Sequence, residues 1–175
     1  MSQPSEELVD LIDTEDNIIG QARRGEIRSR NLLHRGVGII CRNPAGEIYV
    51  HRRTSIKDVF PGLYDMFVGG VVGTGESYAA AAHREIEEEL GIVGPIPKFL
   101  FRHLYVGQHN HTWVSIFEVV WDGPIRLQAS EVEWGTYLTN KQLEEKLAEW
   151  EFVPDGLEIW QRYLSGSFKT GAEAT

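Results

Sequence analysis

The sequence predicts an α/β fold in which a mixed β-sheet carries helices on both of its faces. Apolar runs of strand composition stand before and after one amphipathic helical pattern, turn residues separate these runs, and two more helical patterns follow them. At 175 residues the chain suits a single domain with a sizeable core. We expect an N-terminal extension over 1–30, a main domain over 31–165 and a flexible tail over 166–175.

The start of the chain predicts two strands and a loop. The runs ELVDLI (7–12) and IIGQA (18–22) flank a polar turn from Asp13 to Asn17, which predicts an N-terminal β-hairpin. The segment RRGEIRSRN (23–31) is polar and basic, and we expect it to cross the surface as a loop. Its arginines are most simply solvated, with a phosphate ligand as the alternative.

Three more strands are predicted before the main helix. The runs GVGIICR (36–42) and EIYVHRR (47–53) flank the turn NPAG (43–46), which predicts a second hairpin. MFVGGVV (66–72) predicts a buried strand. Its paired glycines mark a bend or a close approach of the backbone to another group.

The second half of the chain predicts strands and then helices. KFLFRHLYV (98–106) and TWVSIFEVVW (112–121) predict a third hairpin, and WGTYL (134–138) predicts a last strand. Leucines four positions apart predict a helix over 139–149, and a second helical pattern covers 157–164.

The main helical pattern begins near Ser77, a suitable N-cap, and ends at Gly91. On a helical wheel its apolar and acidic side chains fall on adjoining arcs. The apolar set is Ala79, Ala82, Ile86 and Leu90, and the acidic set is Glu85, Glu88 and Glu89. The three like charges repel one another by a few tenths of a kcal/mol per exposed pair, roughly, and a hard divalent cation would remove that cost.

A carboxylate triad beside a glycine-rich turn suits magnesium chemistry. Mg²⁺ prefers oxygen ligands and binds through a few carboxylates while substrate phosphates supply the rest. The glycines between Gly69 and Gly75 let the backbone approach a metal or a phosphate closely. Spacing alone leaves two interpretations open, a metal site and a solvated acidic face.

Composition excludes several classes of partner. A net charge of −9 argues against binding to duplex nucleic acid, while small anionic ligands remain possible if a metal screens them. The single cysteine, Cys41, fits a reducing compartment and, in mid-strand, a small buried hydrophobe. The N-terminal stretch MSQPSEELVD is acidic and has no long apolar run, which predicts neither a signal peptide nor a membrane span, and we expect a cytoplasmic protein.

The stretch GVVGTGESYAAAAHREIEEELGI, from Gly70 to Ile92, resembles the Nudix box at each of its defining positions. The resemblance implies the Nudix α/β/α sandwich, with the predicted N-terminal hairpin added to it. It also implies hydrolysis of a diphosphate that is linked to a second moiety, with Mg²⁺ or Mn²⁺ as cofactor. The partner is then a small diphosphate-containing substrate, whose identity the box leaves open.

The same resemblance implies roles for individual residues of the box. Glu85 and Glu89 correspond to the principal metal ligands, and Glu88 to a further ligand or to the base that activates water. Gly70 would supply a carbonyl oxygen to the metal. Glu76 would support the site by pairing with Arg84.

Segments outside the box are similar to the Nudix branch that contains isopentenyl-diphosphate isomerase and its hydrolase relatives. They are LLHRGVGII, HRRTSIKDVFPGLYDMFVGG and EFVPDGLEIW. Gly69 stands where the isomerase has its cysteine proton donor, and Val71 where it has a metal-binding histidine. The resemblance therefore implies a hydrolase. A prenyl-diphosphate isomerase and a non-catalytic module that senses a ligand are the alternatives.

Three residues outside the box complete the predicted site. Arg53 and Lys57 occupy positions that hold diphosphate in this branch, and both side chains suit that role. Glu131, in ASEVEW, matches an acidic position that serves as a base or an extra ligand. A surface side chain is the alternative for each. The chain could also form a homodimer.

Overall fold

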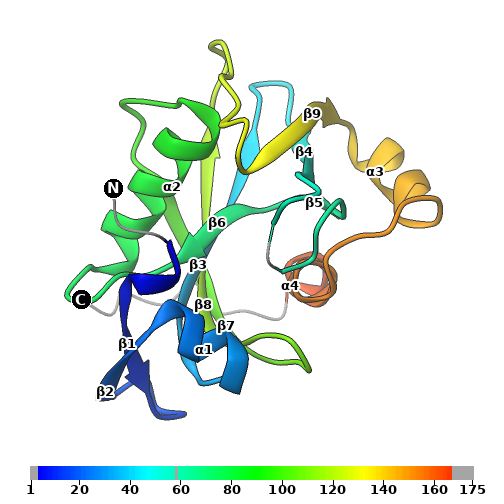
Figure 1. The fold of residues 1–175 in the computed structure, drawn as a ribbon. Coiled ribbons are helices and arrows are strands. Elements are labelled where there is room, and N and C mark those ends of the chain that lie inside the picture. Colours follow the sequence, from blue (N-terminus) through cyan, green and yellow to red (C-terminus); the bar gives the residue numbers. More distant parts are fainter. Residues whose placement is uncertain (1–3, 58, 167–175) are drawn as a thin grey trace.

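The computed structural model describes residues 4–57 and 59–166, and in that part of the chain nine strands form one sheet with helices around it (Figure 1). The strands are β1 (Leu8–Ile12), β2 (Ile18–Arg23), β3 (His34–Arg42), β4 (Ile48–Arg53), β5 (Tyr64–Asp65), β6 (Val68–Val71), β7 (Lys98–Val106), β8 (His111–Val120) and β9 (Val132–Leu138). The α-helices are α1 (Arg24–Arg30), α2 (Tyr78–Leu90), α3 (Asn140–Leu147) and α4 (Pro154–Ser165), after a short 3-10 turn at Pro4–Glu6.

Strand β3 lies at the centre of the sheet. It pairs in parallel with β8 along its whole length, from His34 opposite Thr112 to Arg42 opposite Val120. On its other edge it pairs antiparallel with β6, where Gly38 lies opposite Gly69. The predicted mixed sheet is therefore confirmed, and its centre carries the paired glycines of β6.

Two of the three predicted hairpins are confirmed, β1 with β2 and β7 with β8. For the second hairpin the predicted turn is confirmed, and Gly46 in it has φ of +82°. The predicted pairing of its two strands is wrong. The pairing of β3 with β4 is Arg42 opposite Ile48, and β4 then pairs with β9 and β5. The two edges of β3 are taken by β6 and β8, so β4 turns away and joins other strands.

The basic segment that was expected to be a loop is helix α1, so the prediction of a loop is wrong. Ile27 is the buried side chain of this helix, at 2% exposure, and it packs with Val9 and Ala22 of the hairpin. Asn31 ends the helix in a left-handed conformation, with φ of +50°, and its Nδ2 donates to the Gly107 carbonyl. Contacts with distant segments thus stabilise a helix that has little amphipathic pattern of its own.

Helix α2 begins and ends as predicted. The Ser77 hydroxyl accepts a hydrogen bond from the Ala80 amide at 3.2 Å, and Gly91 ends the helix with φ of +65°. One position of the predicted apolar face is wrong, because Ala79 is exposed and Ala81 is buried instead. The buried stripe takes two neighbouring positions per turn, and Ala79 in the first turn lies outside it.

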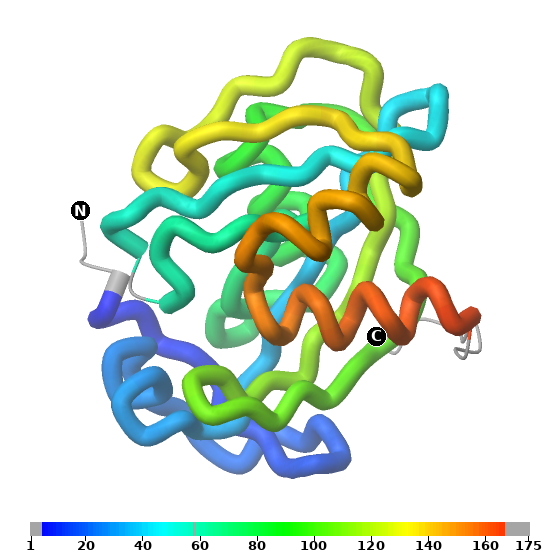
Figure 2. Tube along the Cα trace, turned by 90° about the vertical axis from the view of Figure 1, so that its right-hand side faces the viewer, coloured from blue at the N-terminus to red at the C-terminus, as the bar shows by residue number. Residues whose placement is uncertain are grey.

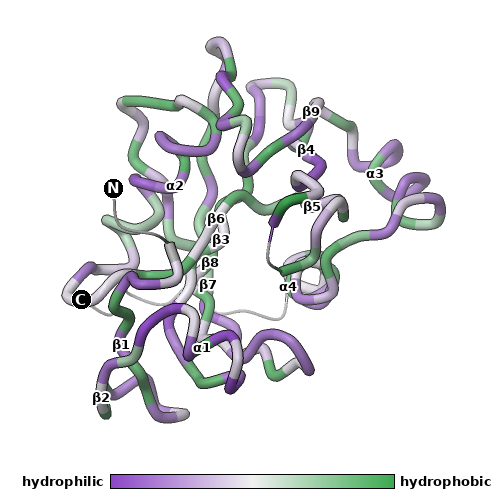
Figure 3. Tube along the Cα trace, in the orientation of Figure 1, coloured by the Kyte–Doolittle hydropathy of each residue, from purple (hydrophilic) through white to green (hydrophobic). Residues whose placement is uncertain are grey.

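Apolar cores lie on both faces of the sheet. Ile39 of β3 packs in the core that α2 covers with Ile86, while its neighbour Ile40 packs in the core that α4 covers with Trp160. This alternation follows from the period of two along a strand. In Figure 3 the helices α2 and α3 carry much polar colour, as expected of helices that cover a core with one face. The predicted layered sandwich is confirmed.

The two C-terminal helices differ from the prediction at their ends. A capping box fixes the start of α3, in which Thr139 Oγ1 accepts from the Gln142 amide at 3.2 Å. Helix α4 begins at Pro154, earlier than predicted, because proline is well suited to a first helical turn. Gly166 follows α4, and the rest of the predicted tail lies outside the described residues. In the described part of the chain no helix is long and apolar enough to cross a membrane.

Asp16 joins the N-terminal hairpin to three other elements. It occupies the turn between β1 and β2 with φ of +68°. Its carboxylate accepts from Arg35 of β3 at 2.6 Å, from Arg102 of β7 at 2.7 Å and from the Tyr78 hydroxyl at 3.0 Å. These contacts hold the turn of the hairpin against β3, β7 and the start of α2.

We predict that Asp16→Asn lowers the free energy of unfolding by about 2 kcal/mol, because two partly buried arginines lose their counter-charge. Asparagine tolerates the left-handed backbone, so strain adds little. Urea unfolding measures the change. Glu15→Gln in the same turn, with an exposed side chain, is the control and should differ from wild type by less than about 0.5 kcal/mol. Equal stability of the two variants would contradict the prediction.

Candidate functional site

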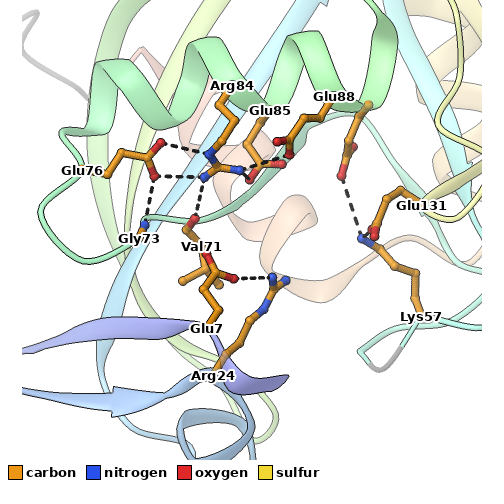
Figure 4. A network of polar contacts seen from close by, with 11 residues as sticks. Glu7, Arg24, Lys57, Val71, Gly73, Glu76, Arg84, Glu85, Glu88 and Glu131 are labelled. Carbon is orange, nitrogen blue, oxygen red and sulfur yellow. Dashed lines mark hydrogen bonds and ion pairs between the residues drawn. The ribbon is translucent and has the colours of Figure 1, made fainter. Parts of the chain in front are cut away.

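Arg84 of α2 connects the acidic side chains around the glycine turn (Figure 4). Its Nε and Nη2 donate to the two carboxylate oxygens of Glu76 at 2.9 and 3.0 Å, which forms a two-point fork. Nη2 also donates to the Val71 carbonyl at 3.1 Å, and Nη1 donates to Glu85 at 2.6 Å and to Glu88 at 3.3 Å. The Glu76–Arg84 pair is present, and it fixes the turn that joins β6 to α2.

Two glycines of β6 lie against other groups with no room for a side chain. A Cβ atom on Gly70 would stand 2.4 Å from Glu85 Oε1, and one on Gly69 would stand 2.0 Å from the Val37 carbonyl oxygen. Real Cβ atoms do not approach other atoms so closely. The close approach predicted from the paired glycines is therefore confirmed, and at Gly70 the approaching group is a carboxylate.

The three glutamates of the predicted triad have different environments. Glu85 and Glu89 are buried, at 7% and 4% exposure, whereas Glu88 is exposed. Burial raises the pKa of the Glu85 carboxyl, and the Arg84 charge opposes this rise. Burial likewise raises the pKa of Glu89, against the opposing charge of Lys57. Both buried carboxylates thus lie where a further positive charge would stabilise them.

Lys57 and Glu131 lie in contact beside Glu89, although they are far apart in the sequence. The Lys57 ammonium contacts the Glu131 carboxylate, as Figure 4 shows, and lies 3.9 Å from Glu89 Oε1. Burial lowers the pKa of Lys57, and the Glu89 charge opposes this effect. The structure therefore brings together two residues that the sequence placed in the site for separate reasons.

Arg53 stands at the end of β4 and holds the loop that follows. Its Nε donates to the Phe60 carbonyl at 3.1 Å and its Nη2 to the Val59 carbonyl at 2.9 Å. Phe60 has a left-handed backbone with φ of +52°. Part of the donor capacity of Arg53 therefore supports the loop that carries Lys57.

The donor set fits a hard cation in its chemistry. In the described residues no three carboxylate, imidazole or thiolate groups are gathered closely enough to hold an ion as they stand. Glu85 is turned toward Arg84, and Glu89 lies nearest Lys57. Carboxylates on successive helical turns, two of them buried beside the bare backbone of Gly70, are nevertheless the oxygen ligands that Mg²⁺ prefers.

A pocket opens beside Gly70, between the sheet, α1 and α4. Figure 2 shows α4 in front of the sheet and the β7–β8 turn beside α1. The cationic residues of the lining are Arg24, Arg28, Arg53 and Lys57, its glycines are Gly36, Gly38, Gly69, Gly70 and Gly156, and its acids are Asp65 and Asp155. The sequence placed the arginines of α1 in a loop and favoured solvated charge, with a phosphate ligand as the alternative.

Asp65 and Asp155 were missed by sequence reasoning. Asp65 Oδ1 accepts from the Phe67 amide at 3.0 Å, and Asp155 Oδ2 accepts from Asn110 Nδ2 at 2.7 Å. Burial, reinforced by the charge of Asp155, raises the pKa of Asp65 to about 7. An aspartate inside the apolar segment LYDMF was the one available signal, and no pattern indicated Asp155.

The box, the paired glycines and the layered sheet agree with a known family. The chain matches the model of the NUDIX domain over residues 32–156. It belongs to the Nudix family. Helix α1 and the N-terminal hairpin precede the matched range. No comparison tests the roles of individual residues, so these stay predictions.

Relatives with similar sequences support the same family. The Nudix protein is 51% identical to the uncharacterized Nudix hydrolase SCO1686 of Streptomyces coelicolor, over 90% of this chain and 88% of that one. It is 36% identical to the uncharacterized Nudix hydrolase YfcD of Escherichia coli strain K12, over 98% and 94%. A solved structure, DR0079 from Deinococcus radiodurans, shares the fold with a TM-score of 0.78 at 26% identity, over 89% and 98%.

We predict that Gly70→Ala destabilises the Nudix protein by about 2 kcal/mol, because the new methyl group must displace the Glu85 carboxylate. Gly73→Ala is the matched control, since a Cβ there meets nothing nearer than 3.6 Å. Thermal unfolding of both variants measures the difference. Gly70→Ala with the stability of Gly73→Ala would show that the packing against Glu85 is loose.

A second prediction concerns pH. Folded Asp65 keeps its proton up to about pH 7, whereas an unfolded aspartate loses it near pH 4. Between these values the unfolded chain binds fewer protons, so stability falls as pH rises. Asp65→Asn keeps an acceptor for the Phe67 amide and removes this titration. We expect its stability to fall less than that of wild type from about pH 4 to 7.

Urea unfolding at several pH values tests this prediction. Asp122→Asn, at an exposed aspartate, is the control and should follow the wild-type profile. Parallel profiles for wild type and Asp65→Asn would show that Asp65 ionises normally in the folded chain.

Proposed function

We propose that this Nudix protein is a Mg²⁺-dependent hydrolase, with Mn²⁺ as a substitute, that cleaves a phosphoanhydride bond. The substrate is a nucleoside diphosphate linked to another moiety, or a similar small diphosphate. Family membership supports the class of reaction. The observation that carries the proposal for this chain is the carboxylate face of α2 beside a pocket with four cationic side chains.

The metal would be held by side chains of α2 and by the backbone of β6. Glu85 and Glu89 are the proposed principal ligands, Glu88 a further ligand and Gly70 a carbonyl ligand. A bound divalent cation screens the charge of the diphosphate and lowers the pKa of the attacking water. Arg84 and Glu76 have a positioning role, because their paired contacts hold the Glu85 carboxylate and the turn at Val71 in place.

The proposed substrate contacts come from the loop after β4. Arg53 and Lys57 line the pocket, and both attract phosphate oxygens. Lys57 contacts Glu131 and lies near Glu89, so a bound diphosphate would compete with these carboxylates for the ammonium group. The diphosphate would then lie between the cations and the carboxylate face.

Two carboxylates are proposed to accept the proton of the attacking water. Glu88 is exposed at the edge of the carboxylate face, so water can reach it. Glu131 lies across from Glu89 and meets the Lys57 ammonium. Release of Lys57 to the diphosphate would leave the Glu131 carboxylate without its counter-charge and better able to accept a proton.

The structure gives little support for an isomerase, which would need a cysteine proton donor in the site. A cysteine at position 69 has no space, because a Cβ there would collide with the Val37 carbonyl. Cys41 lies in the core beneath α2, at 1% exposure, and burial raises its pKa to about 11. Cys41 is therefore unsuited to replace the missing acid. A homodimer and a cytoplasmic location stay predictions from the sequence.

Activity assays with Mg²⁺ and a panel of nucleoside diphosphate derivatives test the proposal, scored by the identity of the products. We predict that EDTA abolishes turnover and that Glu89→Gln lowers kcat by at least about 100-fold, since a neutral amide is a poor ligand. Glu87→Gln, on an exposed position of the same helix, should keep wild-type kcat.

Two outcomes would contradict this proposal. Full Mg²⁺-dependent turnover by Glu89→Gln would remove Glu89 from the metal site. Ligand binding without release of phosphate or nucleotide, across the whole panel, would favour a sensing module over an enzyme.

A further inference from the structure

We propose that Asp65, Asp155, Thr112 and His34 form a subsite that accepts hydroxyl or amino hydrogen-bond donors from the non-phosphate half of the substrate. We call this group the acceptor subsite. The inference rests on the proposed function, because it assigns the part of the pocket that the diphosphate does not occupy. All four residues line the same pocket as Arg53 and Lys57.

The two aspartates provide carboxyl oxygens to the subsite. Asp65 is buried and Asp155 is partly buried, and the charge of Asp155 acts on Asp65. Asp155 accepts two hydrogen bonds, from Asn110 Nδ2 at 2.7 Å and from the Gly156 amide at 3.0 Å, and Asp65 accepts one from the Phe67 amide at 3.0 Å. An ionised carboxyl group has about four lone-pair sites and a protonated one has fewer, so the one or two bonds made here leave capacity for a ligand.

Thr112 gives an independent indication of a ligand. Thr112 is 5% exposed, and its hydroxyl group has no hydrogen-bond partner among the residues that the structure describes. The hydroxyl lies 3.0 Å from the point where a Cβ of Gly36 would stand, and both residues line the pocket. Buried hydroxyl groups in proteins are nearly always paired. A bound polar group would supply the missing partner.

His34 adds a further acceptor. Its Nδ1 lies 2.9 Å from the Leu32 carbonyl oxygen, which requires the proton to be on Nδ1. Burial lowers the pKa of His34, so the ring is neutral and Nε2 is an acceptor. The acceptor subsite thus offers carboxyl and imidazole acceptors, and the hydroxyl of Thr112 can serve either as acceptor or as donor.

The charges of the pocket orient the substrate. Lys57 lies beside the carboxylate face of α2, where the diphosphate is proposed to bind, whereas the charge of Asp155 would repel a phosphate group. A hydrocarbon chain at the aspartates would bury polar groups without hydrogen bonds, which is unfavourable. Ribose hydroxyls and base amino groups supply the donors that these residues need.

Binding of non-hydrolysable analogues tests the acceptor subsite by calorimetry with Mg²⁺ present. The probes are the α,β-methylene diphosphates of adenosine, guanosine, cytidine and uridine, the methylene analogue of isopentenyl diphosphate, and methylenediphosphonate alone. We expect at least one nucleoside analogue to bind about 10-fold or more tightly than methylenediphosphonate, and the isopentenyl analogue to show no such gain. This difference isolates the contribution of the non-phosphate half.

Variants then assign that gain to the acceptor subsite. Thr112→Val and Asp155→Asn should each lower affinity for the preferred nucleoside analogue by about 10-fold and leave affinity for methylenediphosphonate unchanged. Thr112→Val should keep wild-type thermal stability, because its hydroxyl has no partner among the described residues. Ser115→Ala is the matched control, since this buried hydroxyl of β8 also has no described partner, and Ser115 does not line the pocket.

Two results would overturn the inference. One is an isopentenyl analogue that binds as tightly as every nucleoside analogue. The other is an equal effect of Thr112→Val, Asp155→Asn and Ser115→Ala on nucleoside binding. Failure of the wild-type protein to hydrolyse any diphosphate with Mg²⁺ would instead contradict the proposed function.

Discussion

The guanidinium group of Arg84 is the constraint on which the site depends. Four acceptors from the turn and the helix converge on it, namely Glu76, the Val71 carbonyl, Glu85 and Glu88. Carboxylates this close together would repel one another without a central positive charge. Because the guanidinium is planar and its donors have fixed directions, it sets geometry as well as charge. The glycine turn and the carboxylate face therefore keep one relative position.

The two glycines of β6 fix the position of the helix relative to the sheet, because they have no side chains and pack closely on both. Gly70 packs against the Glu85 carboxylate on one side, and Gly69 packs against the Val37 carbonyl of β3 on the other. The central strand, the carboxylate face and the floor of the pocket thus share a few close contacts. A side chain at either glycine would separate groups that have to meet.

The N-terminal segment completes the pocket from outside the range of the family match. Helix α1 brings Arg24 and Arg28 to the lining, and Asp16 ties the preceding hairpin to β3, β7 and Tyr78 of α2. The lining therefore combines these two arginines with Arg53 and Lys57 and with the acids Asp65 and Asp155. Helix α1 thus adds positive charge to the pocket from residues that precede the matched range.

The sequence by itself determined the features that depend on neighbouring residues: the ends of α2, its carboxylate face, two hairpins and the box with its Glu76–Arg84 pair. Periodicity, capping and motif spacing act within a few turns of chain, so a single sequence displays them. Only the tertiary structure decided the departure of β4 from β3, the helical state of α1, and the meeting of Lys57 with Glu131. Strand order and long-range packing place these residues, and no local pattern records which strand takes which edge of β3.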